Sequence, residues 1–306
     1  MKNKRIIRVL LFVAMAAVPA RSFPQDRTER SETELSTGNR SVGIADSSMV
    51  FVRGGKIQVG IDLDEIPRFE KIFEIYSSDL FKDEVPRHWV SVGDFYLDKN
   101  LVTSANFKKF TDANPEWQPG HVSSELDNGN YLKHWAVADS LLKKGDHPVV
   151  NVNWYAAMAY CRWEGKRLPT ESEWEYAARG GGDGMFPWGN EMPDRTRANF
   201  AGTEGGTSAV GKYPANRYGL FDMAGNVWQF LEDEWGPYPS SRPTPQKSPA
   251  VGEKHFLEGT DFLQIRSRRV IRGGSYEGAA VNLWVEYRDS HPPNGSREFV
   301  GFRCAK

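Results

Sequence analysis

The second half of this chain lacks the spacings of regular helices and strands, and this constrains its fold more than any other feature. From Gly180 onward, glycine clusters at 180–182, 205–206 and 273–274, proline-containing loops and scattered tryptophans replace periodic segments. Neither an internal repeat nor a heptad pattern is found. With 10 Trp and 29 Gly in the chain, we expect a loop-rich α+β fold in which aromatic packing forms the core.

Composition excludes several classes of protein. The 39 basic and 40 acidic side chains nearly cancel, whereas nucleic-acid-binding proteins usually carry a basic excess, so no nucleic-acid partner is expected. The 29 glycines and 18 prolines make up about 15% of the 306 residues, well below the roughly 25–30% that marks low-complexity chains. The chain is therefore expected to be globular.

The first residues have the layout of a secretory signal peptide. A basic stretch precedes the apolar residues 9–18, and small residues follow at 18–20. The apolar stretch is too short to span a bilayer. We therefore expect a signal peptide at 1–20, a periplasmic or secreted protein and no membrane span in its mature form; an uncleaved anchor is the alternative. Residues 21–47 are polar and charged, which predicts a disordered linker before a single domain at 48–306.

Short segments of β character occur early and late in the domain. The β-type runs at 49–52 and 57–60 flank Gly54-Gly55, which predicts a hairpin. Residues 88–97 alternate like a further strand, and 269–271 form another short β-type run.

Three helices are predicted between residues 103 and 180. The first has an N-cap at Thr103-Ser104 and ends before Pro115. The second places Trp154, Ala157, Met158 and Cys161 on one face and ends at Gly165. The third begins with the capping box of Thr170 and Glu173 and ends at Gly180.

The two cysteines of the chain, Cys161 and Cys304, are 143 positions apart. Disulfides persist in oxidising compartments, so the expected export and the even count favour a bridge between them. Two separate buried thiols are the alternative.

Several sequence blocks together resemble the formylglycine-generating enzyme (sulfatase-modifying factor) family, over roughly residues 48–306. They are His147–Val150 with Val152–Trp154, Gly165–Glu171, Glu173–Ala177, Phe186–Asn190, Gly219–Met223, Gly225–Trp228, Arg272–Ser275 and Gly301–Ala305. The resemblance implies a single α+β domain related to C-type lectins, with little regular secondary structure. It also implies a disulfide between Cys161 and Cys304.

The sequence departs from this family where its chemistry takes place. Formylglycine-producing members bind copper through two cysteines just after the Arg-Gly-Gly-Ser block, because soft thiolates hold Cu(I). Residues 273–284 contain no cysteine here, so neither copper binding nor formylglycine synthesis by that mechanism is expected. The iron-dependent sulfoxide synthases of the family carry a His-x-x-x-His-x-Glu site, and the six histidines never fall at that spacing.

The resemblance also implies structural calcium sites. The first set of ligands matches Asn199 and the carbonyl of Phe200. The second matches Asp222, the carbonyls of Gly225 and Val227, and Gln229 in place of an acid. Calcium prefers several oxygens including carboxylates, so Asp222 favours the second site and Gln229 weakens it. The alternative is a hydrogen-bonded turn organised by Asp222 alone.

Glu277 is the leading candidate for a catalytic side chain, because it lies beside the position of the family's reactive centre. A carboxylate among aromatic groups could act as a general base, with Ser275, Asn226 and Trp228 expected to line the same cleft. Asp289 and His291 are close in sequence and could assist. The alternative for Glu277 is a salt bridge to Arg272 or Arg288.

The acidic run Glu232–Glu234 could bind a metal ion, but a solvated face is the expected role of such a run. Two functions then fit the sequence. The first is an exported enzyme without the copper cysteines that performs an oxidation or maturation step on a peptide-like or small-molecule substrate, as in the maturation of the siderophore pyoverdine. The second is a non-catalytic periplasmic binding or scaffold protein that uses the same cleft for a peptide or glycan.

Overall fold

A computed structural model describes residues 47–136, 144–238, 246–247, 257 and 261–306. The predicted signal peptide and, apart from its last residue, the predicted linker lie outside these residues. Within the described part of the chain, no helix is both long enough and apolar enough to cross a membrane.

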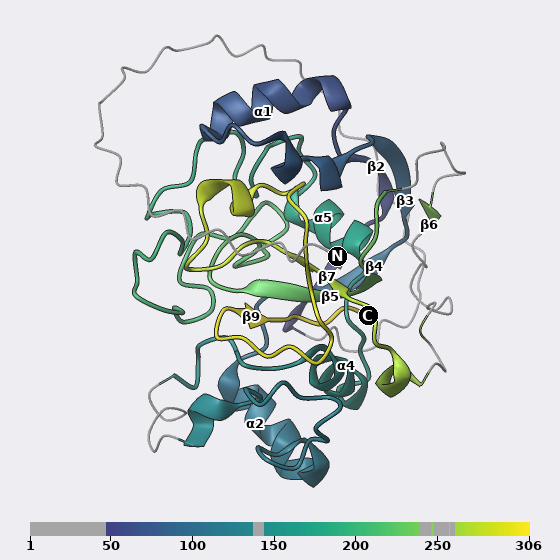
Figure 1. The fold of residues 1–306 in the computed structure, drawn as a ribbon, viewed down its shortest axis with the longest axis vertical. Helices are drawn as coiled ribbons and strands as arrows, with labels where there is room; N and C mark the ends of the chain where they lie inside the picture. The colour runs from purple at the N-terminus through teal and green to yellow at the C-terminus, as the bar shows by residue number, and fades with distance from the viewer. Residues whose placement is uncertain (1–46, 137–143, 239–245, 248–256, 258–260) are drawn as a thin grey trace, which may run out of the picture. The chain divides into compact units, whose positions relative to one another are not determined.

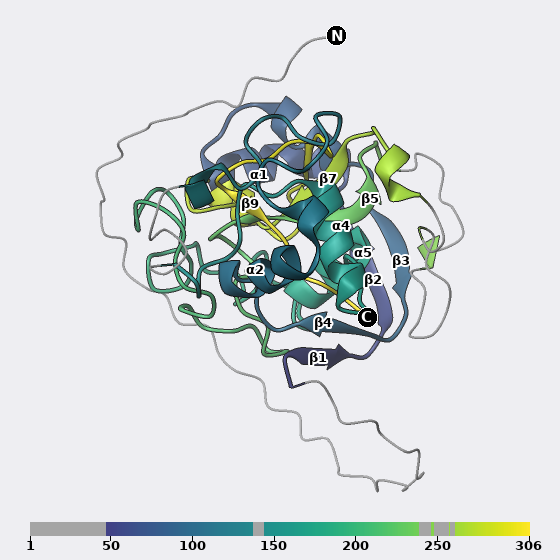
Figure 2. The ribbon, with the colours of Figure 1, turned by 90° about the horizontal axis from the view of Figure 1, so that it is seen from below.

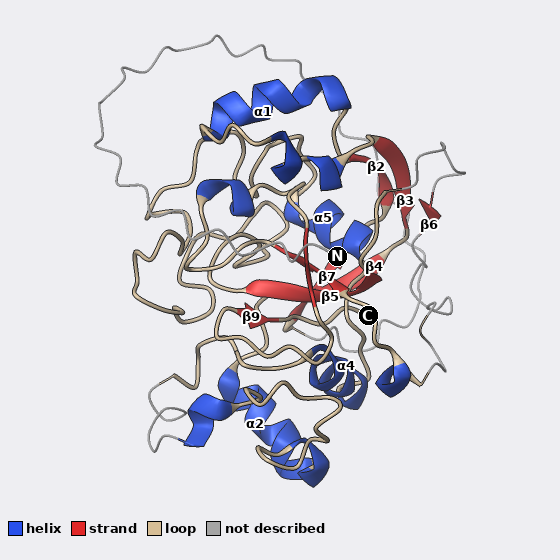
Figure 3. Cartoon of the chain, viewed as in Figure 1, coloured by secondary structure: helices blue, strands red, loops and turns tan. Residues whose placement is uncertain are grey.

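The helices are short and the strands shorter, and loops connect them over most of the chain (Figure 3). The helices are α1 (Ile66–Phe73), α2 (Ser104–Ala113), α4 (Trp154–Trp163) and α5 (Glu171–Ala178). The strands are β1 (Met49–Val52), β2 (Gly55–Val59), β3 (His88–Val92), β4 (Phe95–Asp98), β5 (Trp228–Glu234), β6 (Gln246–Lys247), β7 (Arg269–Arg272), β8 (Asp289–His291) and β9 (Val300–Gly301). The α+β class with little regular secondary structure is thus confirmed.

All three predicted helices form, because each has the cap that its sequence offers. The hydroxyl of Thr103 accepts a hydrogen bond from the backbone N–H of Asn106 at the start of α2 (3.2 Å). At the start of α5, Thr170 and Glu173 form the expected capping box. Gly165 and Gly180 follow α4 and α5 in the left-handed region, with φ of 67° and 59°.

The predicted hairpin at 49–60 is wrong. Strand β1 pairs with β4 and β2 with β3, both antiparallel and in one continuous register, so that Val52 lies opposite Phe95 and Gly55 opposite Val92 (Figure 2). The predicted strand at 88–97 is accordingly two strands. Gly54 lies between β1 and β2 rather than in a hairpin turn. A Cβ at this position would meet the carbonyl oxygen of Val92 at 2.3 Å, so the close approach of the two backbones requires glycine.

A four-stranded sheet in the order β8-β7-β5-β9 lies at the centre of the molecule, with α1 on one side and α2 and α4 on the other (Figure 1). Strand β5 runs antiparallel to β7 and parallel to β9. Helix α5 packs against β3, β5 and β7. This arrangement brings the N-terminus of α5 close to the end of β5.

The core contains many aromatic side chains, as the tryptophan count predicts. Trp154, Trp174 and Trp284 are fully buried, and Trp284 stacks on Phe69 with a ring-centroid distance of 4.4 Å. The disulfide between Cys161 and Cys304 is present, with a Cα–Cα distance of 5.6 Å. It joins α4 to the last residues of the chain and confirms the predicted pairing.

Candidate functional site

The turn after β7, which we predicted to carry the reactive centre, is anchored through its backbone. Gly273 and Gly274 both have positive φ, 94° and 71°, and a Cβ on Gly274 would meet the carbonyl oxygen of Asn282 at 2.8 Å. The N–H of Tyr276 donates to the carbonyl of Asn226 (2.9 Å), and the carbonyl of Tyr276 accepts from Gly202 (2.7 Å). Two other loops therefore fix the position of this turn.

Glu277 projects from this turn into solvent. Its side chain is exposed, whereas Ser275 is only 2% exposed. The two arginines named as alternative partners for Glu277 bind other carboxylates: Arg272 pairs with Glu175, and Arg288 with Glu171. Glu277 forms no ion pair within the described residues, so it is available to a ligand.

The other predicted cleft residues lie in the loop before β5 and at the start of that strand. Asn226 is buried, and its side chain accepts from the N–H of Ser208 (3.0 Å) and donates to the carbonyl of Ser208 (3.2 Å). Trp228 is 7% exposed and lies 6.1 Å from the ring of Tyr287. The side chain of Asn226 thus fixes the loop at Ser208. Its backbone carbonyl accepts a hydrogen bond from the turn that carries Glu277.

The strand β8 places Asp289 and His291 beside β7, where they lie opposite Ile271 and Arg269. Asp289 is exposed. Burial lowers the pKa of His291 to about 4, so this imidazole is neutral near pH 7. Both residues therefore lie alongside β7 and not in the turn that carries Glu277.

In the second predicted set of calcium ligands, the side chain of Gln229 is already engaged in hydrogen bonds. The side-chain oxygen of Gln229 already accepts hydrogen bonds from the indole of Trp174 (3.0 Å) and the guanidinium of Arg303 (2.7 Å). Its amide nitrogen donates to the backbone carbonyl of Asp222 (2.9 Å). Calcium needs six to eight oxygens, and Gln229 cannot contribute one without breaking this buried network.

The first set retains one feature that suits a cation. The side-chain oxygen of Asn199 is buried without a hydrogen-bond partner in the described structure, although the side-chain nitrogen donates to Gly206 (2.9 Å). The carbonyl of Phe200 accepts from Thr203. A buried oxygen without a donor is costly unless water or an ion satisfies it, so calcium at Asn199 stays a prediction.

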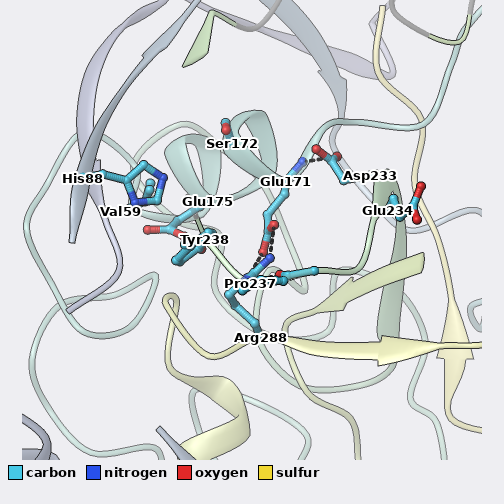
Figure 4. A pocket seen from close by; sticks show the side chains of 11 residues that line it. Val59, His88, Glu171, Ser172, Glu175, Asp233, Glu234, Pro237, Tyr238 and Arg288 are labelled. Carbon is cyan, nitrogen blue, oxygen red and sulfur yellow. Dashed lines mark hydrogen bonds and ion pairs between the residues drawn. The ribbon is translucent and has the colours of Figure 1, made fainter. Parts of the chain in front are cut away.

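A cavity of about 170 Å³ at the N-terminus of α5 was not predicted from the sequence. We call it the α5 cavity; its wall includes His88, Glu171, Ser172, Asp233, Tyr238 and Arg288 (Figure 4). Arg288 forms a bidentate ion pair with Glu171: Nε donates to Oε1 (2.7 Å) and Nη2 to Oε2 (2.8 Å). Its guanidinium also lies over the rings of Tyr238 (3.8 Å) and Trp235 (4.9 Å), which fixes the orientation of the pair.

The carboxyl groups around the α5 cavity differ in charge state because their partners differ. Burial alone would raise the pKa of Glu171, but Arg288 and Arg272 outweigh it and hold this pKa below the ordinary value. Asp233 forms no ion pair within the described residues, and the more distant charge of Arg269 does not outweigh its burial. Burial and the neighbouring charge of Glu171 raise the pKa of Asp233 to about 8.

Asp233 also corrects the expectation of a solvated face at Glu232–Glu234. Glu232 is 1% exposed, Asp233 is partly buried and only Glu234 is exposed. The three residues lie at the end of β5, against which α5 packs. An acidic triplet in the sequence does not reveal that a helix will cover it. The capping box at Thr170 locates the start of that helix but not its neighbour.

Comparison with known proteins accounts for this fold. Residues 37–306 match the family of sulfatase-modifying factor enzyme 1-like domains. The formylglycine-generating enzyme of Thermomonospora curvata is 30% identical over 93% of this chain and 98% of its own length. That of Streptomyces coelicolor is 31% identical over 83% of this chain and 90% of its own length. The chain also matches the serine/threonine-protein kinase pkn1 of Chlamydia caviae at 33% identity over 85% of this chain, but it spans only 38% of that protein.

Two solved structures share the fold. Treponema denticola variable protein 1 superposes with a TM-score of 0.59 at 23% identity, covering 84% of this chain and 94% of the other. PvdO from Pseudomonas aeruginosa superposes with a TM-score of 0.59 at 24% identity, covering 84% of this chain and 93% of the other. The chain belongs to the family of sulfatase-modifying factor enzyme 1-like domains.

Proposed function

We propose that this protein is an exported member of its family that performs a maturation step on a peptide-like substrate without copper. The chemistry proposed is a two-electron oxidation, in which the substrate loses two hydrogens and dioxygen takes up both electrons and both protons to give hydrogen peroxide. Maturation of a siderophore chromophore is one reaction of this class. The signal-peptide pattern of residues 1–20 supports the export.

The observation that carries the proposal is the chemistry of the turn after β7. The two cysteines of the chain, Cys161 and Cys304, are bonded to each other in a disulfide. Residues 273–284 contain no cysteine. Where relatives present thiolates, this turn presents the exposed carboxylate of Glu277 on a backbone held by Asn226 and Gly202. A fixed carboxylate can accept a proton from a bound substrate.

The alternative function is binding without chemistry. It is favoured by the same exposure of Glu277, because a carboxylate in solvent can pair with a cationic group of a peptide without changing it. In that case the turn would serve as a recognition element for a peptide or glycan.

The two functions can be separated by genetic complementation in the native host. A deletion strain would receive the wild type, Glu277→Gln or the matched control Glu116→Gln, which alters an exposed carboxylate on a different segment. Mass spectrometry of exported peptides and siderophores should show species two hydrogens heavier in the deletion strain and with Glu277→Gln, but not with the control. Full complementation by Glu277→Gln would refute the catalytic role.

A second assay tests the absence of the copper reaction. The purified protein is incubated with copper, dioxygen and a cysteine-containing sulfatase peptide. We expect the thiol to remain, because no free thiolate is available to hold the metal. Formation of the aldehyde would refute the proposed function.

A further inference from the structure

Asp233 is the one carboxyl group on the wall of the α5 cavity that forms no ion pair within 4 Å in the described structure; Arg269 acts on it only from a greater distance. Glu171 pairs with Arg288, and Glu175 with Arg179 and Arg272. Glu234 lies 3.6 Å from Arg269. Asp233 accepts only the backbone N–H of Glu171 (2.7 Å). An acceptor is therefore left on this wall for a donor from outside the chain.

His88 supplies a second side-chain atom on this wall without a hydrogen-bond partner in the described structure. Its ring is 8% exposed and lines the cavity (Figure 4). The Nδ1 atom lies 2.9 Å from the carbonyl of Pro86, which can only accept, so Nδ1 carries the hydrogen. The other ring nitrogen, Nε2, has no hydrogen-bond partner among the described residues.

The wall as a whole favours a cation over an anion or a metal. Three of its four carboxyl groups are paired with arginines, which leaves Asp233 as the group that a cation can approach. In the described residues, no three His, Cys, Asp or Glu side chains are grouped so as to hold a metal ion. Glu234 and Pro237 are exposed, so the cavity reaches solvent at this end.

We propose that the α5 cavity binds a small organic cation, with an ammonium group at Asp233 and a second hydrogen-bond donor for Nε2 of His88. Figure 4 shows the two side chains on opposite sides of Glu171, so the ligand has a donor at each end. The site is separate from the turn that carries Glu277 and does not depend on the function proposed for it.

The binding can be measured by titration calorimetry with 4-amino-1-butanol on the purified protein. The neutral control is 1,4-butanediol, which has the same length but carries a hydroxyl in place of the ammonium group. We expect the amine to bind at least about tenfold more tightly, because charge-assisted hydrogen bonds are the stronger ones. Equal binding of the two probes, or displacement of the amine by calcium or magnesium, would overturn the proposal.

Proton release gives a second readout. Asp233 is largely protonated at pH 7, because its pKa is about 8, and binding of an ammonium group favours its ionised form. Titrations in two buffers of different ionisation enthalpy should therefore show close to one proton released for each amine bound. Binding without proton release contradicts the assignment to Asp233.

Three variants complete the test. Asp233→Asn keeps an oxygen for the N–H of Glu171 and should bind the amine about tenfold more weakly, without proton release. His88→Phe should weaken binding similarly and retain proton release. The control Glu116→Gln, at an exposed position outside both sites, should bind as the wild type does. Thermal melts establish that each variant is folded, and unchanged affinity in Asp233→Asn would overturn the proposal.

Discussion

We expect the substitution Glu84→Gln to stabilise the protein at neutral pH, although it removes a buried carboxyl group. Glu84 is completely buried, and one of its oxygens accepts the backbone N–H of Arg288 (2.9 Å). The other oxygen has no hydrogen-bond partner in the described structure. Burial outweighs the attraction of Arg288 and raises the pKa of Glu84 from 4.5 to about 8.

The magnitude follows from linkage between protonation and folding. Because this pKa is higher in the folded state, the folded chain binds the proton more tightly than the unfolded chain does. The contribution of Glu84 protonation to the unfolding free energy is fully present below about pH 4.5 and falls as the pH rises towards 8. With these two values, the free energy of unfolding falls by about 2.5 kcal/mol between pH 5 and pH 7. The amide side chain of the variant cannot ionise and avoids this loss.

Urea unfolding at pH 5, 6 and 7 tests the prediction. The difference in unfolding free energy between Glu84→Gln and wild type should grow by about 2.5 kcal/mol over this range in favour of the variant. The control Glu116→Gln, at an exposed position, should remain within about 0.5 kcal/mol of wild type throughout. Parallel curves for Glu84→Gln and wild type would show that Glu84 is not protonated in the folded protein.

Three further outcomes are expected. Replacing Cys161 and Cys304 by alanine should lower the unfolding free energy by about 5 kcal/mol in urea titrations, because their bond closes a loop of 143 positions; a loss below about 1 kcal/mol would contradict this. Arg288→Lys should cost about 3 kcal/mol in the same assay, since lysine cannot form both bonds to Glu171 or stack between two rings; a stability equal to wild type would contradict it. Millimolar calcium, but not magnesium, should raise the melting temperature of the wild type and not of Asn199→Leu; an equal response of both proteins would refute the site at Asn199.

The helices could be predicted from the sequence because their signals are local. A capping threonine, an apolar face and a terminal glycine all lie within one segment, as in the helix that begins after Thr170. The strand partners could not be predicted in this way. Gly54-Gly55 has the composition of a hairpin turn, but the partners of its flanking strands are about 40 residues away at Val92 and Phe95.

The candidate turn was located from the sequence, but its environment was not. The absence of cysteine after the Arg-Gly-Gly-Ser block can be read directly and predicts the loss of the copper reaction. Whether Glu277 is exposed or paired depends on where Arg272 and Arg288 point. The structure shows that they bind carboxylates of α5, at Glu175 and Glu171.

The sequence by itself determined the residue types available for chemistry, the helix boundaries and, with its only two cysteines, the one disulfide that could form. Only the tertiary structure decided which charges are buried together. Asp233 and Glu171 are 62 positions apart, and neither segment encodes the desolvation that the other imposes on it. A pKa depends on the local dielectric and on nearby charges in space, so the unpaired carboxyl of the α5 cavity exists only once β5 and α5 have packed together.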